Sequence, residues 1–156
     1  MAATRGSDTK SSGKGGAAPL ISMKNAHRID PGSIDQYIEA GGFTALRKAL
    51  DMEPKAVFGE VTESGLQGRG GAGFPTGIKE KLTGEALCEA CGPKYIVCNA
   101  DEGDPGTFKD RAIMENDPHL MLEGIIISAY AIGAEKGYIY IRGEYGESIE
   151  RLRTAV

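Results

Sequence analysis

Apolar residues recur at helical spacing through the first third of the chain. Asp30-Pro31-Gly32-Ser33 has the composition of a turn, and Ser33 can cap a helix that carries Ile34, Tyr37 and Ile38 on one face. Gly41-Gly42 ends that pattern, and it resumes over residues 43–50 and again over 54–64. The pattern therefore predicts three short helices, the last of which leads directly into a glycine-rich segment.

The second half of the chain alternates between strand and helix patterns. The apolar run 95–98 has strand length, and a continuous run of this kind suits a strand that is buried on both faces. Asp117-Pro118 opens a helix that Gly133 closes, 137–142 predicts a second strand, and 148–156 predicts a final helix. This β-α-β order predicts an α/β fold with a parallel sheet and flanking helices. Two strands alone do not make a stable sheet, so we expect a longer chain or a partner to complete it.

Composition narrows the class of protein. Residues 1–28 are predicted to be a flexible tail, with a leader or expression remnant as the alternative for its first part, and residues 29–156 a single domain. A net charge of −4 argues against nucleic acid as a partner. The longest apolar run, 124–134, is too short to span a bilayer, and no secretory signal is visible, so we expect a cytoplasmic protein without direct membrane insertion.

The most informative segment is the glycine-rich stretch 65–77. Glycines let backbone N–H groups approach a flat or anionic ligand without a Cβ in the way. Arg69 and Lys79 would pair naturally with a phosphate, and Phe74 could stack on a nicotinamide or adenine ring. The alternatives are a mobile loop, an Arg-Gly-Gly element that touches RNA, and a Phe74 that anchors the loop to the core.

An acidic loop, 99–106, follows the first predicted strand. Ligands of open α/β sheets bind beyond the carboxyl ends of the strands, which is where this loop lies. Asp101 and Glu102 can accept hydrogen bonds from sugar or ribityl hydroxyls, and Asn99 can both donate and accept at a flavin or nicotinamide edge. The alternative is an ordinary turn, since Asp, Gly and Pro cluster in turns for local reasons. A glycine cradle together with this loop is the layout of a nucleotide or flavin site.

The cysteines and histidines give weaker signals. Cys88 and Cys91 have metal-ligand or redox spacing, but a closed zinc or iron–sulfur site needs four ligands and the chain has three thiols, an odd number that also argues against a disulfide framework. They remain weak metal candidates, and no metal site is predicted. Cys98 is expected to point into the sheet core, and His119, in the first turn of a helix, is expected to pack or cap.

The motifs occur in an order that resembles a known family. Residues 65–77, 94–111, 117–119 and 138–145 together resemble the FMN-binding, NADH-oxidising subunit of respiratory complex I and its soluble relatives. Those relatives include NAD-dependent and electron-bifurcating hydrogenases and NAD-linked formate dehydrogenases. The likeness runs from about Ile29 to the C-terminus.

The resemblance implies a Rossmann-like domain and an NADH dehydrogenase-type flavoprotein. NADH would stack over FMN and pass it a hydride, and electrons would then leave singly to iron–sulfur clusters of partner subunits. No side chain would act as acid or base, because hydride transfer belongs to the cofactors. By motif position, Phe74 would stack on NADH and Asp104 would lie near the nicotinamide. The residues implied to bind FMN are Gly68, Arg69, Gly70, Gly71, Gly73, Lys79, Asn99, Asp101 and Glu102.

The sequence also departs from the family. Family members usually continue through a second FMN loop, a ubiquitin-like domain and a helical domain with a [4Fe–4S] site, so this chain would hold about half of the flavin domain. The [4Fe–4S] cluster is then expected on a C-terminal part or a partner subunit. Glu80, Lys81 and Leu82 stand where the family usually carries aromatic residues. The alternative function is a shortened, catalytically silent scaffold that docks redox partners.

Overall fold

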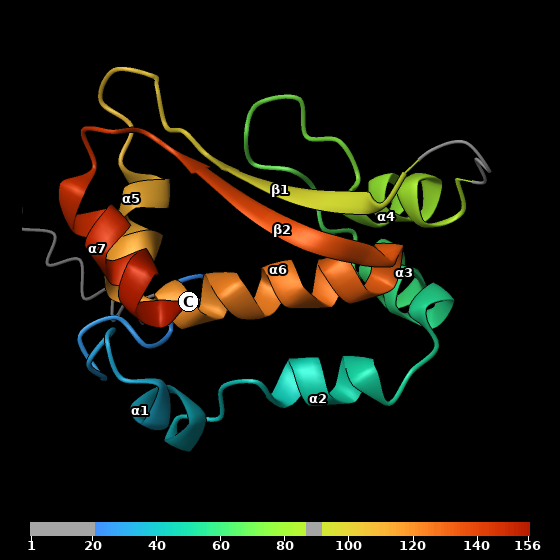
Figure 1. Ribbon diagram of the computed structural model, residues 1–156, viewed down its shortest axis with the longest axis horizontal. Helices are drawn as coiled ribbons and strands as arrows, with labels where there is room; N and C mark the ends of the chain where they lie inside the picture. Colours follow the sequence, from blue (N-terminus) through green and yellow to red (C-terminus); the bar gives the residue numbers. More distant parts are fainter. Residues whose placement is uncertain (1–20, 87–91) are drawn as a thin grey trace, which may run out of the picture.

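The computed structural model describes residues 21–86 and 92–156, and it forms helices packed around a two-stranded sheet (Figure 1). Three helices precede the glycine-rich segment and one follows it. A strand, two helices, a second strand and a final helix complete the described chain. In chain order the elements are α1 (Ile34–Glu39), α2 (Thr44–Leu50), α3 (Pro54–Glu63), α4 (Thr76–Gly84), β1 (Lys94–Ala100), α5 (Lys109–Asn116), α6 (Pro118–Ile132), β2 (Ala134–Ile141) and α7 (Gly146–Ala155).

The sheet is parallel, which confirms the predicted α/β class. Val97 pairs with Tyr138 and Ala100 with Ile141, and the crossover between the strands runs through α5 and α6. The prediction that the first strand is buried on both faces is wrong for the described chain, because Tyr95 is 49% and Val97 61% exposed. Helix α6 runs along one face of the sheet only (Figure 1). The other face therefore presents alternate side chains of both strands to solvent.

The core divides into two clusters along α6. At one end Ala131 packs with Ala49, Val57 and Phe58, which joins α6 to α2 and α3. The second cluster lies toward the carboxyl ends of the strands and contains Ala100, Met114 and Leu152, with Cys98, Met121, Ile139, Ile141 and Tyr145 packed against it. The predicted inward orientation of Cys98 is thus confirmed. Both clusters include residues of α6, so α6 is the central helix against which the other helices pack.

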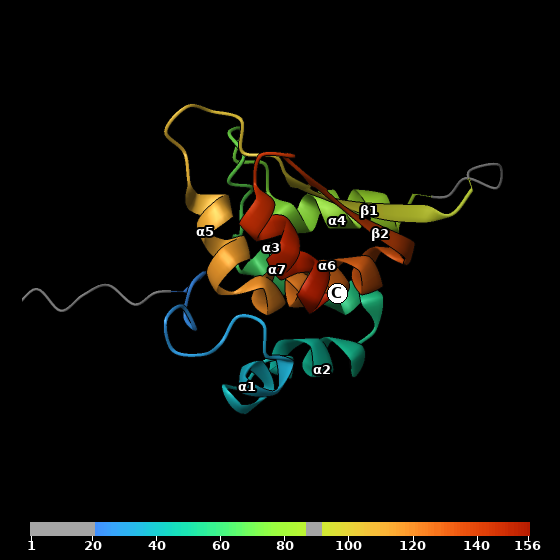
Figure 2. The same ribbon diagram turned by 60° about the vertical axis from the view of Figure 1, so that its left-hand side comes forward.

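The N-terminal helices are tied to α6 by a buried carboxylate. Glu123, which is 5% exposed, accepts hydrogen bonds from the hydroxyl of Tyr37 and from the backbone amides of Phe43 and Leu46. Ser33 caps α1 as predicted, since its hydroxyl accepts from the Gln36 amide at 3.3 Å. Helices α1 and α2 consequently lie against α6 on the side away from the sheet (Figure 2).

Residues 21–28, assigned to the tail by the sequence, take part in this packing. They form turns, Asn25 and Ala26 are buried, and the Asn25 amide donates to the Asp117 carboxylate at 3.2 Å. The packed part of the chain therefore starts before residue 29. Among the described helices, none has the length and apolarity needed to cross a membrane.

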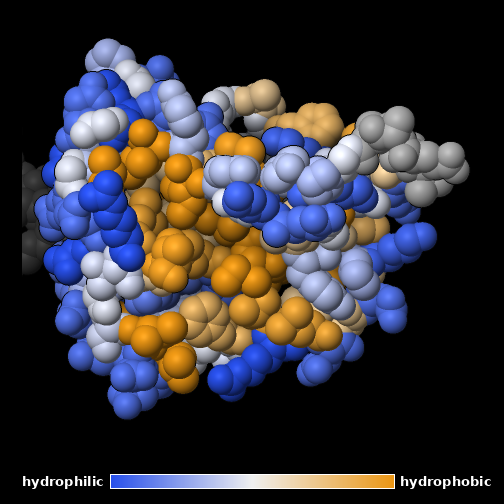
Figure 3. Space-filling model, viewed as in Figure 1, coloured by the Kyte–Doolittle hydropathy of each residue, from blue (hydrophilic) through white to orange (hydrophobic). Residues whose placement is uncertain are grey.

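An apolar surface lies beside the second strand. Figure 3 shows hydrophobic side chains gathered over β2, α6 and α7 on the face seen in Figure 1. A cavity of about 330 Å³ on this surface is lined by Ile139, Ile141, Ile149, Leu152, Arg153 and Val156. In the described residues β2 pairs only with β1, so one edge of each strand is free. A free edge of this kind can pair with a further strand.

Candidate functional site

The two loops singled out by the sequence stand on the same side of the sheet. The glycine-rich loop lies between α3 and α4, and the acidic loop follows β1. Both rise on the side of the sheet away from α6 in either view (Figures 1 and 2). Within the described chain no hydrogen bond or ion pair joins them directly. The fold thus brings both predicted loops to one surface and leaves each of them free to face a ligand.

The glycine loop is closed at its base and open at its tip. The Gly68 amide donates to the Phe74 carbonyl and the Thr76 amide to the Leu66 carbonyl, both at 2.9 Å. Gly71 and Gly73 have φ values of 130° and 64°, which glycine adopts without the penalty that other residues would meet. Among the described residues, 21–86 and 92–156, no hydrogen-bond acceptor pairs with the backbone amides of residues 69–73. The loop therefore offers a run of unpaired N–H donors, which is the chemistry of an anion cradle.

The side chains of the glycine loop and of the start of α4 are free to contact a ligand. Phe74 is 51% exposed, which contradicts the core-anchor alternative. Arg69 and Lys79 make no ion pair with any residue the structure describes. Lys79 and Thr76 line a cavity of about 380 Å³ between α4 and β1, together with Glu80, Thr83, Tyr95, Ile96, Val97, Ser128 and Ile132. Arg69 in the loop and Lys79 on the helix that follows it, both without an ion pair in the described chain, favour a phosphate-bearing ligand.

Close helix packing holds α4 in place behind this loop. A Cβ added to Gly77 would overlap the hydroxyl of Thr62 and lie 2.5 Å from the Thr62 nitrogen and 2.7 Å from its Cα. Helices α3 and α4 therefore approach each other at a glycine, where no larger side chain fits. This contact fixes the start of α4, and with it the base of the glycine loop and the stem of Lys79.

The acidic loop leaves some of its predicted residues free and engages others. Asn99 turns its side-chain oxygen toward the Asp101 amide at 3.3 Å, while both residues stay exposed. Asp104 is also exposed, and its carbonyl accepts from the Thr107 amide and hydroxyl at 3.1 and 2.6 Å. Gly106, with a φ of 84°, completes this turn. The side chains of Asn99, Asp101 and Asp104 are consequently presented at the surface.

Glu102 has a different placement from its neighbours. It is 6% exposed, and its two carboxylate oxygens accept from the amides of Asp110 and Arg111 at 3.1 and 3.2 Å. The carboxylate therefore caps the N-terminus of α5, where negative charge also complements the helix dipole. Its carbonyl accepts from Arg142 at 3.0 Å and from the Tyr145 hydroxyl at 3.3 Å. Sequence reasoning missed Arg142 and Tyr145 as parts of the site, since they lie 40 residues or more away.

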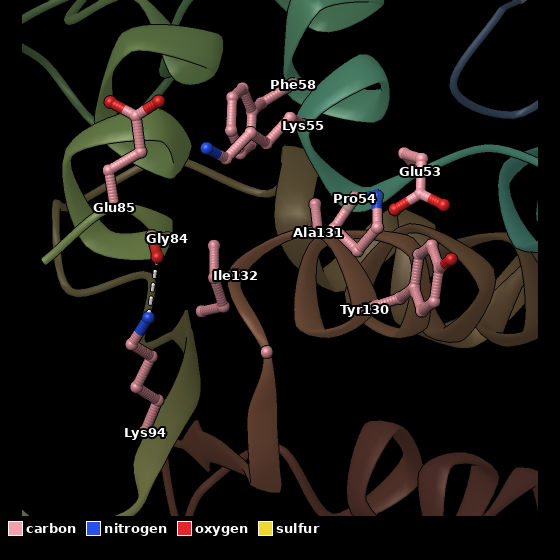
Figure 4. A pocket seen from close by; sticks show the side chains of 11 residues that line it. Glu53, Pro54, Lys55, Phe58, Gly84, Glu85, Lys94, Tyr130, Ala131 and Ile132 are labelled. Carbon is pink, nitrogen blue, oxygen red and sulfur yellow. Dashed lines mark hydrogen bonds between the residues drawn. The ribbon is translucent and has the colours of Figure 1, made fainter. Parts of the chain in front are cut away.

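A further cavity contains none of the residues predicted to bind the cofactors. It has a volume of about 440 Å³ and opens at the start of β1, the opposite end of the sheet from the acidic loop (Figure 4). Phe58, Tyr130 and Ile132 form its apolar wall, and Lys94 donates to the Gly84 carbonyl at 2.7 Å on its rim. None of the predicted cofactor residues lines it, so it does not belong to the loop site.

The remaining candidates are structural where the structure describes them. Cys88 and Cys91 lie outside the described residues. Among the residues that the structure does describe, no three His, Cys, Asp or Glu side chains form a cluster that could hold a metal ion. Burial and the nearby Asp110 raise the pKa of the Cys98 thiol. His119 is 2% exposed, its ring centroid lies 5.5 Å from that of Tyr37, and burial lowers its pKa. The predicted packing role of His119 is confirmed.

Comparison with known proteins gives a consistent family. Residues 61–156 match the family model described as the Nuo51 FMN-binding domain. A subunit of the NADH-quinone oxidoreductase of Aquifex aeolicus is 54% identical over 134 residues, which is 86% of this chain and 30% of that protein. HndC, a subunit of the NADP-reducing hydrogenase of Solidesulfovibrio fructosivorans, is 53% identical over 136 residues, covering 87% and 27% of the two chains.

The fold is similar to that of a solved redox enzyme. The crystal structure of an NAD⁺-reducing [NiFe]-hydrogenase in the H₂-reduced state superposes with a TM-score of 0.60 at 45% identity. The superposition covers 65% of this chain and 17% of that one. The present chain spans roughly a third of the length of the curated relatives that it matches, namely 30%, 32% and 27% for three of them.

Proposed function

The chain belongs to the family of the Nuo51 FMN-binding domain, and on that premise we propose that it forms the N-terminal part of an NADH-oxidising flavoprotein subunit in a multisubunit redox complex. The observation that carries the proposal is the run of amides at residues 69–73 that find no acceptor in the described chain, in a loop that carries Arg69 and is followed by a helix that carries Lys79. An FMN phosphate or pyrimidine edge fits these donors, because each would accept hydrogen bonds that the described protein leaves unmade. A bound FMN would supply the chemistry that links a two-electron hydride donor to one-electron acceptors.

Each loop contributes a separate binding task. The amides of Gly70, Gly71 and Gly73, with the base glycine Gly68, form the cradle, and Arg69 and Lys79 neutralise the phosphate charge. Asn99 and Asp101 bind the ribityl chain and the ring edge through their exposed polar atoms. Glu102 supports the same site indirectly, since its carboxylate caps α5 and thereby fixes the loop that carries Asp101.

The nicotinamide cofactor is held by two exposed groups, Phe74 and Asp104. Phe74 stacks on NADH from the base of the glycine loop, where half of its surface is open to solvent. Asp104 lies beside the nicotinamide and accepts hydrogen bonds there. No side chain gives or takes a proton in this scheme. The protein's contribution is to hold two rings in contact and to limit their alternative orientations.

The domain is completed outside the described residues. Residues 29–156 make up the N-terminal part of the FMN- and NADH-binding domain, and the apolar surface beside β2 receives further elements of it. The [4Fe–4S] cluster lies on a C-terminal continuation or on a partner. The partners are the iron–sulfur subunits of a complex I-like, hydrogenase or formate dehydrogenase assembly in the cytoplasm.

The test uses the assembled complex that contains this chain. Its anaerobic absorbance is recorded before and after addition of NADH, and its FMN content is measured after acid extraction. We expect a flavin band that NADH bleaches, and loss of FMN in Lys79→Ala but not in the matched control Lys81→Ala, an exposed lysine on the same helix. A complex with neither flavin nor NADH-driven dye reduction would support the silent scaffold instead.

A further inference from the structure

We propose that Arg142 is a positioning residue that, together with Tyr145, clamps the acidic loop in the conformation that presents Asn99, Asp101 and Asp104. This inference rests on the proposed function, because the presented residues are those assigned to FMN and NADH. Neither Arg142 nor Tyr145 touches the cofactors in this scheme. Both act through the backbone of the loop.

The parallel register brings the two segments together. Ala100 pairs with Ile141, so the residues that follow, Asp101 and Arg142, leave the sheet side by side. The Arg142 guanidinium then lies 3.8 Å from the Asp101 carboxylate and donates to the Glu102 carbonyl at 3.0 Å. A single side chain at the end of β2 therefore contacts two consecutive residues of the loop that leaves β1.

Tyr145 makes the contact more specific. Its hydroxyl donates to the same Glu102 carbonyl at 3.3 Å, and the Arg142 guanidinium lies 5.8 Å from its ring centroid. The guanidinium of Arg111, on α5, lies 5.9 Å from the same centroid. Two cations at one aromatic ring restrict the rotamers of all three side chains. The clamp is thus braced from the end of β2, from the turn before α7 and from α5.

Glu102 is held through both its backbone and its side chain. Its backbone carbonyl accepts hydrogen bonds from Arg142 and Tyr145, while its side-chain carboxylate is buried and caps α5. One residue of the loop is therefore fixed on both its backbone and its side chain. Asp101 and Gly103 are bonded directly to this fixed residue, so their conformation follows from Glu102.

The charge on Arg142 is permanent. Its hydrogen bond with Glu144, at 3.4 Å, raises the pKa of the guanidinium above its ordinary value. A cation near Asp101 offsets part of the negative charge that this carboxylate would otherwise direct at a bound flavin. The clamp consequently sets both the position and the electrostatic environment of the cofactor-binding carboxylate.

The experiment compares variants of the assembled complex. Arg142→Met removes the charge and the donors at similar length, Arg142→Lys keeps the charge with fewer donors, and Arg47→Met changes an exposed arginine of α2 as the control. Hydrogen exchange of residues 101–108 is followed by mass spectrometry, and FMN retention and the KM and kcat for NADH are measured alongside.

The clamp predicts a graded response. Exchange in residues 101–108 should accelerate by about tenfold or more in Arg142→Met, as expected for loss of a charge-assisted hydrogen bond, and less in Arg142→Lys. FMN retention should fall in the same order, with Arg47→Met like the unmodified protein. Unchanged exchange in Arg142→Met would overturn the inference, as would faster exchange with unchanged FMN retention and KM. A wild-type complex without FMN would refute the proposed function, while the exchange comparison would still decide whether Arg142 holds the loop.

Discussion

The buried carboxylate of Glu123 allows a quantitative prediction for Glu123→Gln. Its oxygens accept from Tyr37 at 2.5 Å and from the amides of Phe43 and Leu46 at 3.0 Å each. The Phe43 and Tyr37 donors share one oxygen, and the Leu46 amide faces the other. A glutamine can offer its carbonyl to only one side, so its NH₂ group must face at least one backbone N–H. The helix start at α2 then loses a partner that water cannot replace.

The magnitude follows from these contacts. Hydrogen bonds to a charged group contribute about 1.5–3 kcal/mol each, and a buried donor left unpaired costs about 1–3 kcal/mol. Glu123→Gln retains part of the set, so we expect a loss of about 3 kcal/mol in the free energy that opens α1 and α2. Tyr37→Phe removes one donor and leaves two, so it should cost about 1.5–2 kcal/mol.

The assay is hydrogen exchange of residues 34–50 in the purified subunit that carries this sequence. Glu123→Gln should accelerate exchange there by about a hundredfold, and Glu63→Gln, at an exposed position of α3, should leave it unchanged. The double variant with Tyr37→Phe should show a coupling of about 1 kcal/mol, since both side chains share one contact. Exchange within about twofold of the parent, or fully additive effects, would refute the assignment of Glu123 as the anchor of α2.

Lowering the pH should also remove the stabilisation that Glu123 provides. Burial alone raises the pKa of Glu123, but the hydrogen bonds from Tyr37 and from the amides of Leu46 and Phe43 outweigh it, and the pKa lies below its ordinary value. The unfolded chain therefore takes up this proton first as the pH falls. The contribution of Glu123 is complete above about pH 4.3 and is lost as the pH falls through the folded-state pKa. Glu123→Gln should flatten this part of the profile of stability against pH.

Three further predictions follow from single sites. Gly77→Ala forces a Cβ onto Thr62 and should lower the free energy of unfolding by about 1–3 kcal/mol, while Gly70→Ala, which meets no atom within 4 Å, should not, as urea titration would show. Glu102→Gln weakens the cap of α5 and should cost about 1–2 kcal/mol, seen as faster exchange in residues 109–116; equal exchange would contradict the capping role. Burial lowers the pKa of His119, so stability should decline as the pH falls below about 6.5, where the unfolded chain binds the proton first, and a His119→Phe variant that keeps this decline would contradict the prediction.

Most helices and both strands carry local sequence signals and were predictable from the sequence. Helices α4 and α5 lack such signals and were not predicted. Helix α6 has a proline in its first turn and a glycine at its end, and its apolar residues mark it over its full length. Helix α4 buries Gly77 and Glu80 while Ile78 and Leu82 are exposed, so its hydrophobic pattern is inverted. Helix α5 takes its cap from Glu102, eight residues before Asp110, and a capping pattern read over three or four residues cannot contain it.

The burial of β1 was mispredicted for a related reason. A continuous apolar run fits a strand covered on both faces, and the run 95–98 predicts such a strand. In the described chain helices cover one face of the sheet, and Tyr95 contacts Tyr138 across the open face with ring centroids 6.0 Å apart. In the proposed larger domain, further elements would cover the open face, and the apolar run would then fit a strand buried on both sides. This agrees with the proposal that further elements pack on this sheet.

The candidate site separates residues that a single sequence reveals from residues that need the fold. The groups proposed to bind a ligand lie in loops whose local composition is unusual, as at Gly71 and Asp101, so they stand out in the sequence itself. Arg142 lies in a segment that helps carry the family resemblance, but nothing local indicates its link to Glu102, which exists only because β1 and β2 pair in one register. A shift of that register by one residue would turn Arg142 to the other face of the sheet and break the contact. Residues that position a loop in this way depend on strand pairing across the crossover, so they become visible only in the folded chain.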